Sequence, residues 1–285
     1  MKMELMTKTQ VFTTADSLRN HLLVAGKDRR IGFVPTMGAL HEGHLSLVDR
    51  AMEDCDVVVV SIFVNPTQFN NSEDLVNYPR ALDSDIEMLE RSGETIVFAP
   101  DVNEMYPEGH VPKRLDLGLL GSVLEGQFRE GHFDGVVEVV YRLFDIVKPT
   151  HAYFGEKDFQ QLAVIRKMVR EFEMGINIVG CPTYRELGGL ASSSRNQRLS
   201  DSEKKAALII NECLKEAKSR KDEWTPDVAK QYIQKLFNES SLELEYINFV
   251  DSDSFEEVDQ WTGNTRACIA AFCGPVRLID NMSMA

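Results

Sequence analysis

Residues 31–44 read IGFVPTMGALHEGH, and this stretch decides the fold. Its apolar start, Ile31 to Val34, predicts a short strand, and the segment from Leu45 to Cys55 predicts a helix. A strand, a glycine-bearing turn and a helix start together bring backbone N–H groups onto an anion. His41 and His44 stand three residues apart at the helix start, so both imidazoles can donate to a phosphate from one face. The stretch predicts a nucleotide phosphate site; a solvated histidine at a helix start is the plainer alternative.

Segments of strand-like and helix-like pattern alternate along the first two thirds of the chain. The run from Val57 to Val64, which is mostly β-branched, predicts a central strand that is covered on both faces. Further strands are predicted at residues 95–98, 152–154 and 176–179, and helices at 83–91, 133–146 and 159–172. This alternation predicts an α/β fold with a doubly wound, Rossmann-like parallel sheet. Ligands of such sheets bind beyond the carboxyl ends of the strands.

The pattern changes after about residue 181. A polar, serine-rich stretch at 190–199 is followed by helical patterns over 202–218 and from Thr225 to Phe237. Three strand-like segments then follow, at residues 242–250, 266–272 and 276–280. We therefore predict two domains, with residues 1–182 forming the Rossmann-like domain and residues 183–285 forming a smaller α+β lid domain.

Composition narrows the possible partners. The 285 residues carry a formal net charge of −14, which disfavours a nucleic acid partner but still admits ATP at a few local cations. No apolar run approaches the roughly 18 residues that suggest a membrane span, and the start lacks the apolar region of a secretory signal. We therefore expect a cytoplasmic enzyme without a membrane partner. The five scattered cysteines lack a Cys-X-X-Cys pair, which predicts reduced and mostly buried thiols.

Polar side chains follow the 57–64 strand directly. The carboxamides of Asn65 and Gln68 can both donate and accept hydrogen bonds, which suits a substrate that carries hydroxyl groups and a carboxylate. A plain turn at the end of the strand is an equally good interpretation, since Asn-Pro favours turns.

A second cluster follows the 152–154 strand. Gly155 permits close approach of a nucleotide, Lys157 supplies positive charge for phosphate, and Asp158 can accept from a ribose hydroxyl. By local sequence alone, a charged helix start with Asp158 as its cap is favoured. A third cluster, residues 192–196, has hydroxyls and a guanidinium that can clamp a triphosphate, although serine-rich loops are more often simple linkers. It falls at the expected domain junction, where clefts and closing lids form.

With these clusters in this order, the chain resembles the pantoate–β-alanine ligase family. The resemblance runs from Thr9 to Asn281 and rests on PTMGALHEGH (35–44), VNPTQF (64–69), YPR (78–80), GHF (131–133), GEKDFQQ (155–161) and SSRN (193–196). His-X-Gly-His alone marks a wide nucleotidyltransferase superfamily. The resemblance implies ATP-dependent condensation of (R)-pantoate with β-alanine through a pantoyl adenylate. The products would be pantothenate, a precursor of coenzyme A, together with AMP and pyrophosphate.

The resemblance also implies residue roles. The catalytic set is His44, as the proton donor, with His41, Lys157 and Arg195. The ATP-binding set is Met37, Gly38, His41, His44, Gly155, Glu156, Lys157, Asp158, Tyr184, Ser192, Ser193, Ser194 and Arg195. The substrate-binding set is Pro35, Thr36, Met37, Asn65, Gln68 and Gln161. Magnesium would accompany ATP, held mainly by the phosphates, with Asp85 as a candidate contact and Asp83 as a second. Residues 66–82 are the candidate lid loop, and the family implies a homodimer.

The chain departs from the family pattern at three positions. Gly188 replaces an acidic residue, Ser192 an apolar one and Glu130 a proline, which bears on loop rigidity and adenosine affinity more than on the reaction. Three other functions compete with the ligase. A nucleotidyltransferase would not need Gln68 and Gln161, and a nucleotide-binding regulatory protein would not turn over. A relative of the class I aminoacyl-tRNA synthetases is disfavoured by the acidic chain.

Overall fold

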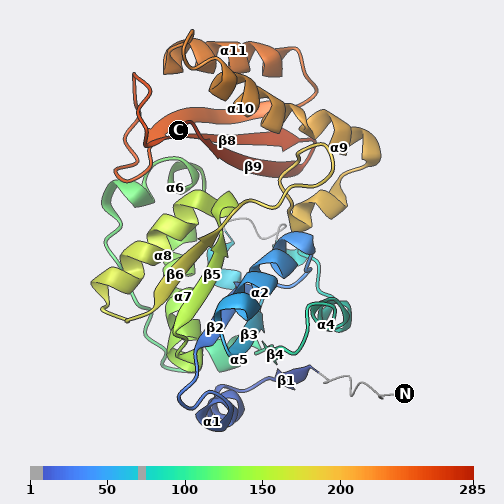
Figure 1. Cartoon of the computed structure of the whole chain (residues 1–285), viewed down its shortest axis with the longest axis vertical. Helices are drawn as coiled ribbons and strands as arrows, with labels where there is room; N and C mark the ends of the chain where they lie inside the picture. Colours follow the sequence, from blue (N-terminus) through green and yellow to red (C-terminus); the bar gives the residue numbers. More distant parts are fainter. Residues whose placement is uncertain (1–8, 70–74) are drawn as a thin grey trace. The chain divides into compact units, whose positions relative to one another are not determined.

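The computed structural model describes residues 9–69 and 75–285 and divides into two compact units (Figure 1). Unit 1 comprises residues 1–116, 129–156 and 161–182, and unit 2 comprises residues 117–128, 157–160 and 183–285. The last of these divisions falls between residues 182 and 183. Residues 117–128 and 157–160, which we expected in the first domain, lie in unit 2. There Glu125 accepts from Arg277, and the carbonyl of Lys157 accepts from Asn281.

Unit 1 is built on a six-stranded sheet in which every pairing is parallel, as predicted. In the order β1-β4-β3-β2-β5-β6, its strands are β1 (Gln10–Phe12), β4 (Ile96–Phe98), β3 (Val57–Ile62), β2 (Ile31–Thr36), β5 (His151–Gly155) and β6 (Asn177–Cys181). The chain runs outward from β2 through β3 to β4 and then returns to place β5 on the other side of β2. The carboxyl ends of β2 and β5 therefore flank the point where strand order reverses, the usual ligand site of such sheets.

Helices cover both faces of this sheet. Val34 of β2 packs in one cluster with Val48 and Ala51 of α2 (Glu42–Asp54). The next residue toward the amino end, Phe33, contacts Phe144 of α7 (His132–Val147), with ring centroids 6.1 Å apart. Because neighbouring strand residues point to opposite faces, α2 and α7 lie on opposite sides of the sheet. The other helices of this part of the chain are α1 (Ala15–Ala25), α4 (Leu82–Leu89), α5 (Val102–Met105) and α8 (Phe159–Glu171).

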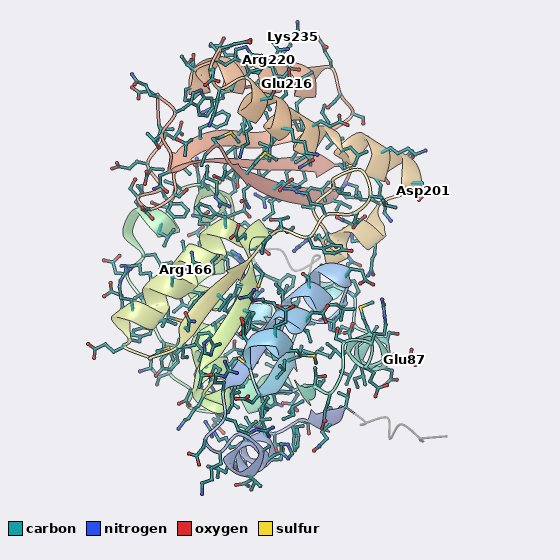
Figure 2. The ribbon with its side chains drawn as sticks, in the orientation of Figure 1. Glu87, Arg166, Asp201, Glu216, Arg220 and Lys235 are labelled. Atoms are coloured by element: carbon teal, nitrogen blue, oxygen red, sulfur yellow. The ribbon has the colours of Figure 1, made fainter. Side chains whose placement is uncertain are left out.

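Unit 2 is built on an antiparallel sheet, β7 (Glu243–Asp251), β8 (Thr265–Cys273) and β9 (Val276–Ser283), in that order. Its main helices are α9 (Asp201–Ala207), α10 (Ile209–Ser219) and α11 (Pro226–Asn238). The single helix predicted over 202–218 is two, divided at Leu208. Apolar residues of all three strands and these helices form one core, which gives the α+β unit that was predicted. Figure 2 shows Glu87 of α4 and Lys235 of α11 among the charged side chains at the surface.

None of the helices in the described residues is long and apolar enough to cross a membrane.

The cysteines give the first testable prediction. All five are buried and unpaired, as expected from the sequence, and burial raises the pKa of Cys181 to about 11 and that of Cys268 to about 12. Only a thiolate reacts readily with aromatic disulfide reagents, so native protein at pH 8 is expected to react very slowly. Five thiols should then be titrated in guanidinium chloride. Rapid reaction of even one thiol in the native protein would contradict this burial.

Candidate active site

The turn after β2 has a left-handed backbone. Gly38 has φ 75° and Ala39 has φ 49°, a conformation that turns the N–H groups of Ala39 and Leu40 to one side. The buried carboxylate of Asp85 accepts both, at 3.0 Å from Ala39 N and 2.7 Å from Leu40 N. A Cβ at position 38 would lie 2.9 Å from Asp85 Oδ2, so glycine is required there for space as well as for φ. The turn and Asp85 therefore form one fixed structure.

His41 and His44 cap the start of α2 through their Nδ1 atoms. His41 Nδ1 accepts from Gly43 N at 3.1 Å, and His44 Nδ1 accepts from His41 N at 3.3 Å. An Nδ1 that accepts a backbone N–H carries no proton, so the proton of each neutral ring lies on Nε2. The ring centroids are 4.0 Å apart. The helix start thus holds two imidazoles in the tautomer that can donate from Nε2, next to the positive end of the helix dipole.

The carboxamide of Gln68 is oriented by Asn65. Thr67 N donates to Asn65 Oδ1 (3.3 Å), and Asn65 Nδ2 donates to the carbonyl of Gly135 (3.2 Å). Because a backbone N–H can only donate and a carbonyl can only accept, these two partners fix which end of Asn65 is nitrogen. Asn65 Nδ2 also donates to Gln68 Oε1 (3.2 Å), which leaves Gln68 Nε2 directed at Met37 Sδ, 2.8 Å away. Gln68 therefore offers hydrogen-bond donors on the side of Met37.

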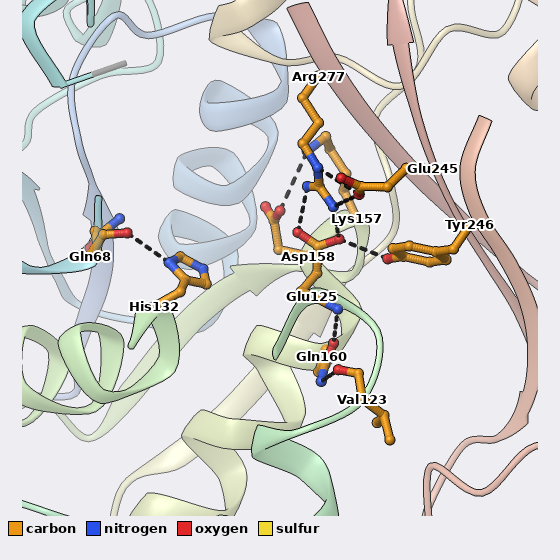
Figure 3. Close-up of polar contacts among 10 residues, drawn as sticks. All are labelled: Gln68, Val123, Glu125, His132, Lys157, Asp158, Gln160, Glu245, Tyr246 and Arg277. Carbon is orange, nitrogen blue, oxygen red and sulfur yellow. Dashed lines mark hydrogen bonds and ion pairs between the residues drawn. The ribbon is translucent and has the colours of Figure 1, made fainter. Parts of the chain in front are cut away.

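Two residues of α7 hold the backbone of this turn. His132 Nδ1 donates to the carbonyl of Gln68 at 2.9 Å, a contact drawn in Figure 3. Gly135 lies so close that a Cβ there would be 2.4 Å from the carbonyl oxygen of Thr67. Tyr106 contacts the side chain of Asn65, donating to its Oδ1 at 2.8 Å. Burial raises the pKa of Tyr106, so its phenol keeps the proton that it donates.

The remaining candidates of unit 1 lie on β2, after β3, at the end of β5 and at the start of α8. Thr36 is buried, with Oγ1 donating to the carbonyl of Ser61 at 2.7 Å, and Pro35 is half-buried beside it. Asn65 is 1% exposed, and its carboxamide makes the contacts described above. Gly155 ends β5, Glu156 begins the next turn, and Gln161 is half-buried in the first turn of α8. Of the candidate lid loop, residues 70–74 lie outside the described residues.

The candidates of unit 2 lie on two segments. Lys157 and Asp158 adjoin in a turn of 3₁₀ helix (Glu156–Asp158), with Lys157 Nζ 3.4 Å from Asp158 Oδ1. The side chain of Ser193 caps the second turn of 3₁₀ helix (Ser194–Arg198) by accepting from Arg195 N at 3.3 Å. The predicted cap of α8 by Asp158 stays a prediction, since the contact observed for its carboxylate is the one with Lys157. The other candidates are the buried Ser192 and Ser194 and the exposed Tyr184.

The departure at Gly188 has a structural basis in a tight hairpin. Arg185 pairs with Ala191 across it, and Gly188 and Gly189 at its tip have φ 94° and 106°. L residues rarely adopt such φ values, so an acidic side chain at position 188 would be strained in this backbone. The base of the hairpin is fixed by Arg185, which donates to both carboxylate oxygens of Asp280, at 2.7 and 3.0 Å.

The surroundings of Asp85 can be compared with the predicted magnesium contact. Both oxygens of Asp85 accept backbone N–H groups, and residues 9–69 and 75–285 contain no group of three His, Cys, Asp or Glu side chains suited to a metal ion. Asp83 is exposed in the same helical turn. The described residues therefore offer no metal site built from protein side chains alone. A contact of Asp85 with magnesium held by phosphates stays a prediction, and its observed role is to build the turn.

A substitution separates the two roles of Asp85. In Asp85→Asn the amide nitrogen faces one backbone N–H, so one buried donor loses its acceptor. We expect the free energy of unfolding to fall by about 1–3 kcal/mol in urea titrations. The magnesium concentration that gives half-maximal activity should stay the same. A variant of undiminished stability with a tenfold higher magnesium requirement would instead make Asp85 a metal ligand.

Tyr106 and His132 are the residues that sequence reasoning missed. The pattern Gly131-His132-Phe133 was noticed without a role for its histidine, and nothing local marks Tyr106.

The chain is similar to known proteins over almost its whole length. Residues 10–283 match a family model described as pantoate-beta-alanine ligase. A pantothenate synthetase from Bacteroides fragilis (strain YCH46) is 48% identical over 277 residues, covering 96% of this chain and 98% of that protein. The crystal structure of a pantothenate synthetase from Thermus thermophilus is 39% identical, with a TM-score of 0.92 over 97% of this chain and 99% of the other. A pantoate-beta-alanine ligase from Francisella tularensis, complexed with beta-gamma ATP and beta-alanine, is 35% identical, with a TM-score of 0.84 over 97% and 98%.

Proposed function

The chain belongs to the pantoate-beta-alanine ligase family, and we propose that it condenses pantoate with β-alanine at the expense of ATP. Membership confirms the resemblance noted from the sequence. The main structural support for the proposal is the pair of imidazoles at the start of α2. Backbone N–H groups hold both rings at Nδ1, which places their protons on Nε2. They lie beside the switch in strand order, where a nucleotide binds such sheets.

The first step of the proposed reaction forms a pantoyl adenylate. A carboxylate oxygen of pantoate attacks the α-phosphorus of ATP, and the bond from that phosphorus to the bridging oxygen breaks to release pyrophosphate. Negative charge accumulates on the phosphate oxygens, and fixed donors aimed at them lower the barrier. In the proposal His44 and His41 supply these donors from Nε2, and His44 delivers a proton to the departing phosphate. The cations Lys157 and Arg195 are assigned to the triphosphate because the family pattern is intact there.

In the second step the neutral amine of β-alanine attacks the carbonyl carbon of the adenylate. An amide bond forms, the acyl–phosphate bond breaks, AMP leaves and the amine gives up a proton. Gln68 orients pantoate in this scheme, supported by the fixed direction of its carboxamide. Gln161, Met37, Pro35, Thr36 and Asn65 complete the proposed substrate set, and Gly38, Gly155, Glu156, Asp158, Tyr184 and Ser192–Ser194 the proposed nucleotide set.

Other parts of the proposal rest on the family resemblance. Magnesium is proposed only as the ion that accompanies the triphosphate. A homodimer and a cytoplasmic location belong to the proposal on the same basis. Light scattering coupled to size-exclusion chromatography would test the dimer.

Isotope exchange tests the function itself. Purified protein with ATP and labelled pyrophosphate should exchange label into ATP only when pantoate is present. Subsequent addition of β-alanine should release AMP in an amount equal to the pantothenate formed. Exchange that needs no pantoate, or AMP release that is indifferent to β-alanine, would overturn the proposal.

A further inference from the structure

Hydrogen bonds within unit 2 hold both ends of the segment Lys157–Gln160. At one end, the carbonyl of Lys157 accepts from Asn281 Nδ2 at 2.8 Å. At the other end, Gln160 Nε2 donates to the carbonyls of Leu120 and Val123, both at 2.8 Å. Gln160 Oε1 accepts from Glu125 N at 3.0 Å. Figure 3 shows Gln160 between Val123 and Glu125.

The segment 117–128 is in turn fixed to the sheet of unit 2 by charge. Arg277 donates to both carboxylate oxygens of Glu125, each at 2.8 Å, and also pairs with Glu245 (Figure 3). Tyr246 donates to the same carboxylate at 2.7 Å. Burial lowers the pKa of Arg277, but the two carboxylates outweigh it and hold that pKa above its usual value. The anchor of Gln160 is therefore a charge-assisted network and not a loose loop.

The anchor of Lys157 is a single, oriented carboxamide. Asn281 is 5% exposed on β9, and its Oδ1 accepts from Arg266 Nη1 at 2.6 Å. A guanidinium can only donate and a carbonyl can only accept, so Asn281 must direct its Nδ2 at the carbonyl of Lys157. The guanidinium of Arg266 also lies over the ring of Phe159, 4.5 Å from its centroid. These contacts fix the backbone on either side of Asp158.

We propose that Asn281 is a positioning residue for ATP, which acts by fixing the backbone of Lys157 through its carbonyl. This inference rests on the proposed function, which assigns Lys157 to the triphosphate. The side chain of lysine is a flexible stem of four carbons. The position of its ammonium group therefore depends on how firmly the backbone is fixed. The nucleotide set proposed above ends at Arg195, and the role assigned to Asn281 is exerted through the backbone of Lys157.

Asn281→Asp removes the hydrogen bond from Asn281 Nδ2 to the carbonyl of Lys157. Aspartate keeps an acceptor for Arg266 and cannot donate to the carbonyl of Lys157. We expect the KM for ATP to rise about 3- to 10-fold, the usual effect of one lost hydrogen bond, with the KM for pantoate unchanged. Calorimetry with α,β-methylene-ATP should show the same loss of affinity without turnover. Lys218→Met is the matched control, because it removes another side-chain donor to β9, the bond from Lys218 Nζ to the carbonyl of Ser283. It should leave ATP affinity unchanged.

A double-mutant cycle tests whether Asn281 acts through Lys157. In a Lys157→Met background, Asn281→Asp should weaken α,β-methylene-ATP binding no further. An unchanged ATP affinity in the single variant, or an equal loss in both backgrounds, would overturn the inference. Asn281→Ala run through the same cycle decides the matter should the aspartate variant fold poorly. Pantoate-dependent exchange by the unaltered protein is measured in parallel, and its absence would overturn the proposed function instead.

Discussion

His44→Ala is expected to lower the rate of pantoate-dependent pyrophosphate exchange by about 10²–10³-fold, as loss of one preorganised donor to a developing anion typically does. The structure gives the reason, because the Nδ1 contact with His41 N places the proton of His44 on Nε2. Initial rates at saturating ATP and pantoate are the measurement. Near-normal turnover would remove His44 from the proton-donor role.

A second substitution at the same position separates chemistry from folding. His44 is the third residue of α2, and its side chain also accepts the backbone N–H of His41. Alanine therefore removes part of the helix cap as well, at a cost of about 1 kcal/mol. Glutamine is favoured at that position in capping boxes and can accept the same N–H. His44→Gln should therefore recover the melting temperature that alanine loses while its exchange rate stays low. Recovery of rate together with stability would show that His44 matters only for the cap.

The fold could be predicted where local pattern and burial coincide. The strand Val57–Ile62 is buried on both faces, so its sequence is apolar at every position except Ser61. Strand β1 was missed because its three residues are mostly exposed and carry no such run. The division between α9 and α10 was missed for another reason. Leu208 keeps helical dihedral angles, φ −59° and ψ −27°, and no glycine or proline marks the break.

The site could be predicted where its parts are adjacent in sequence. His41, His44 and the turn before them come from one stretch, so their chemistry was readable from residue types and spacing. The partners that fix the turn at Leu40 and the carboxamide of Asn65 come from distant segments. Asp85 reaches Leu40 across 45 positions, and Tyr106 reaches Asn65 across 41. A carboxylate in the sequence looks the same whether it binds a metal or two backbone N–H groups, and only the fold distinguishes them.

Gln68→Glu should be the most damaging change for pantoate use. Asn65 Nδ2 donates to one end of the Gln68 carboxamide, so the other end must be the NH₂ group, directed at Met37 Sδ. Glutamate has the same shape but places an acceptor there, against a substrate that offers a carboxylate and hydroxyl oxygens. We expect the KM for pantoate to rise about 100-fold or more, since both the lost donor and charge repulsion contribute. The KM for ATP should change little.

Two further variants separate these contributions. Gln68→Met removes the donor without adding charge and should raise the KM for pantoate about 10-fold, and Gln68→Ala should act similarly. Tyr106→Phe removes one of the three donors to Asn65 Oδ1 and leaves the two from Thr67. It should therefore raise the KM for pantoate less than Gln68→Met or Gln68→Ala does. Pantoate kinetics of Gln68→Glu that match those of the unaltered protein would mean that the carboxamide does not face pantoate. An effect of Gln68→Met as large as that of Gln68→Glu would mean that the direction of the carboxamide does not matter, because the loss would then come from packing and not from the placement of a donor.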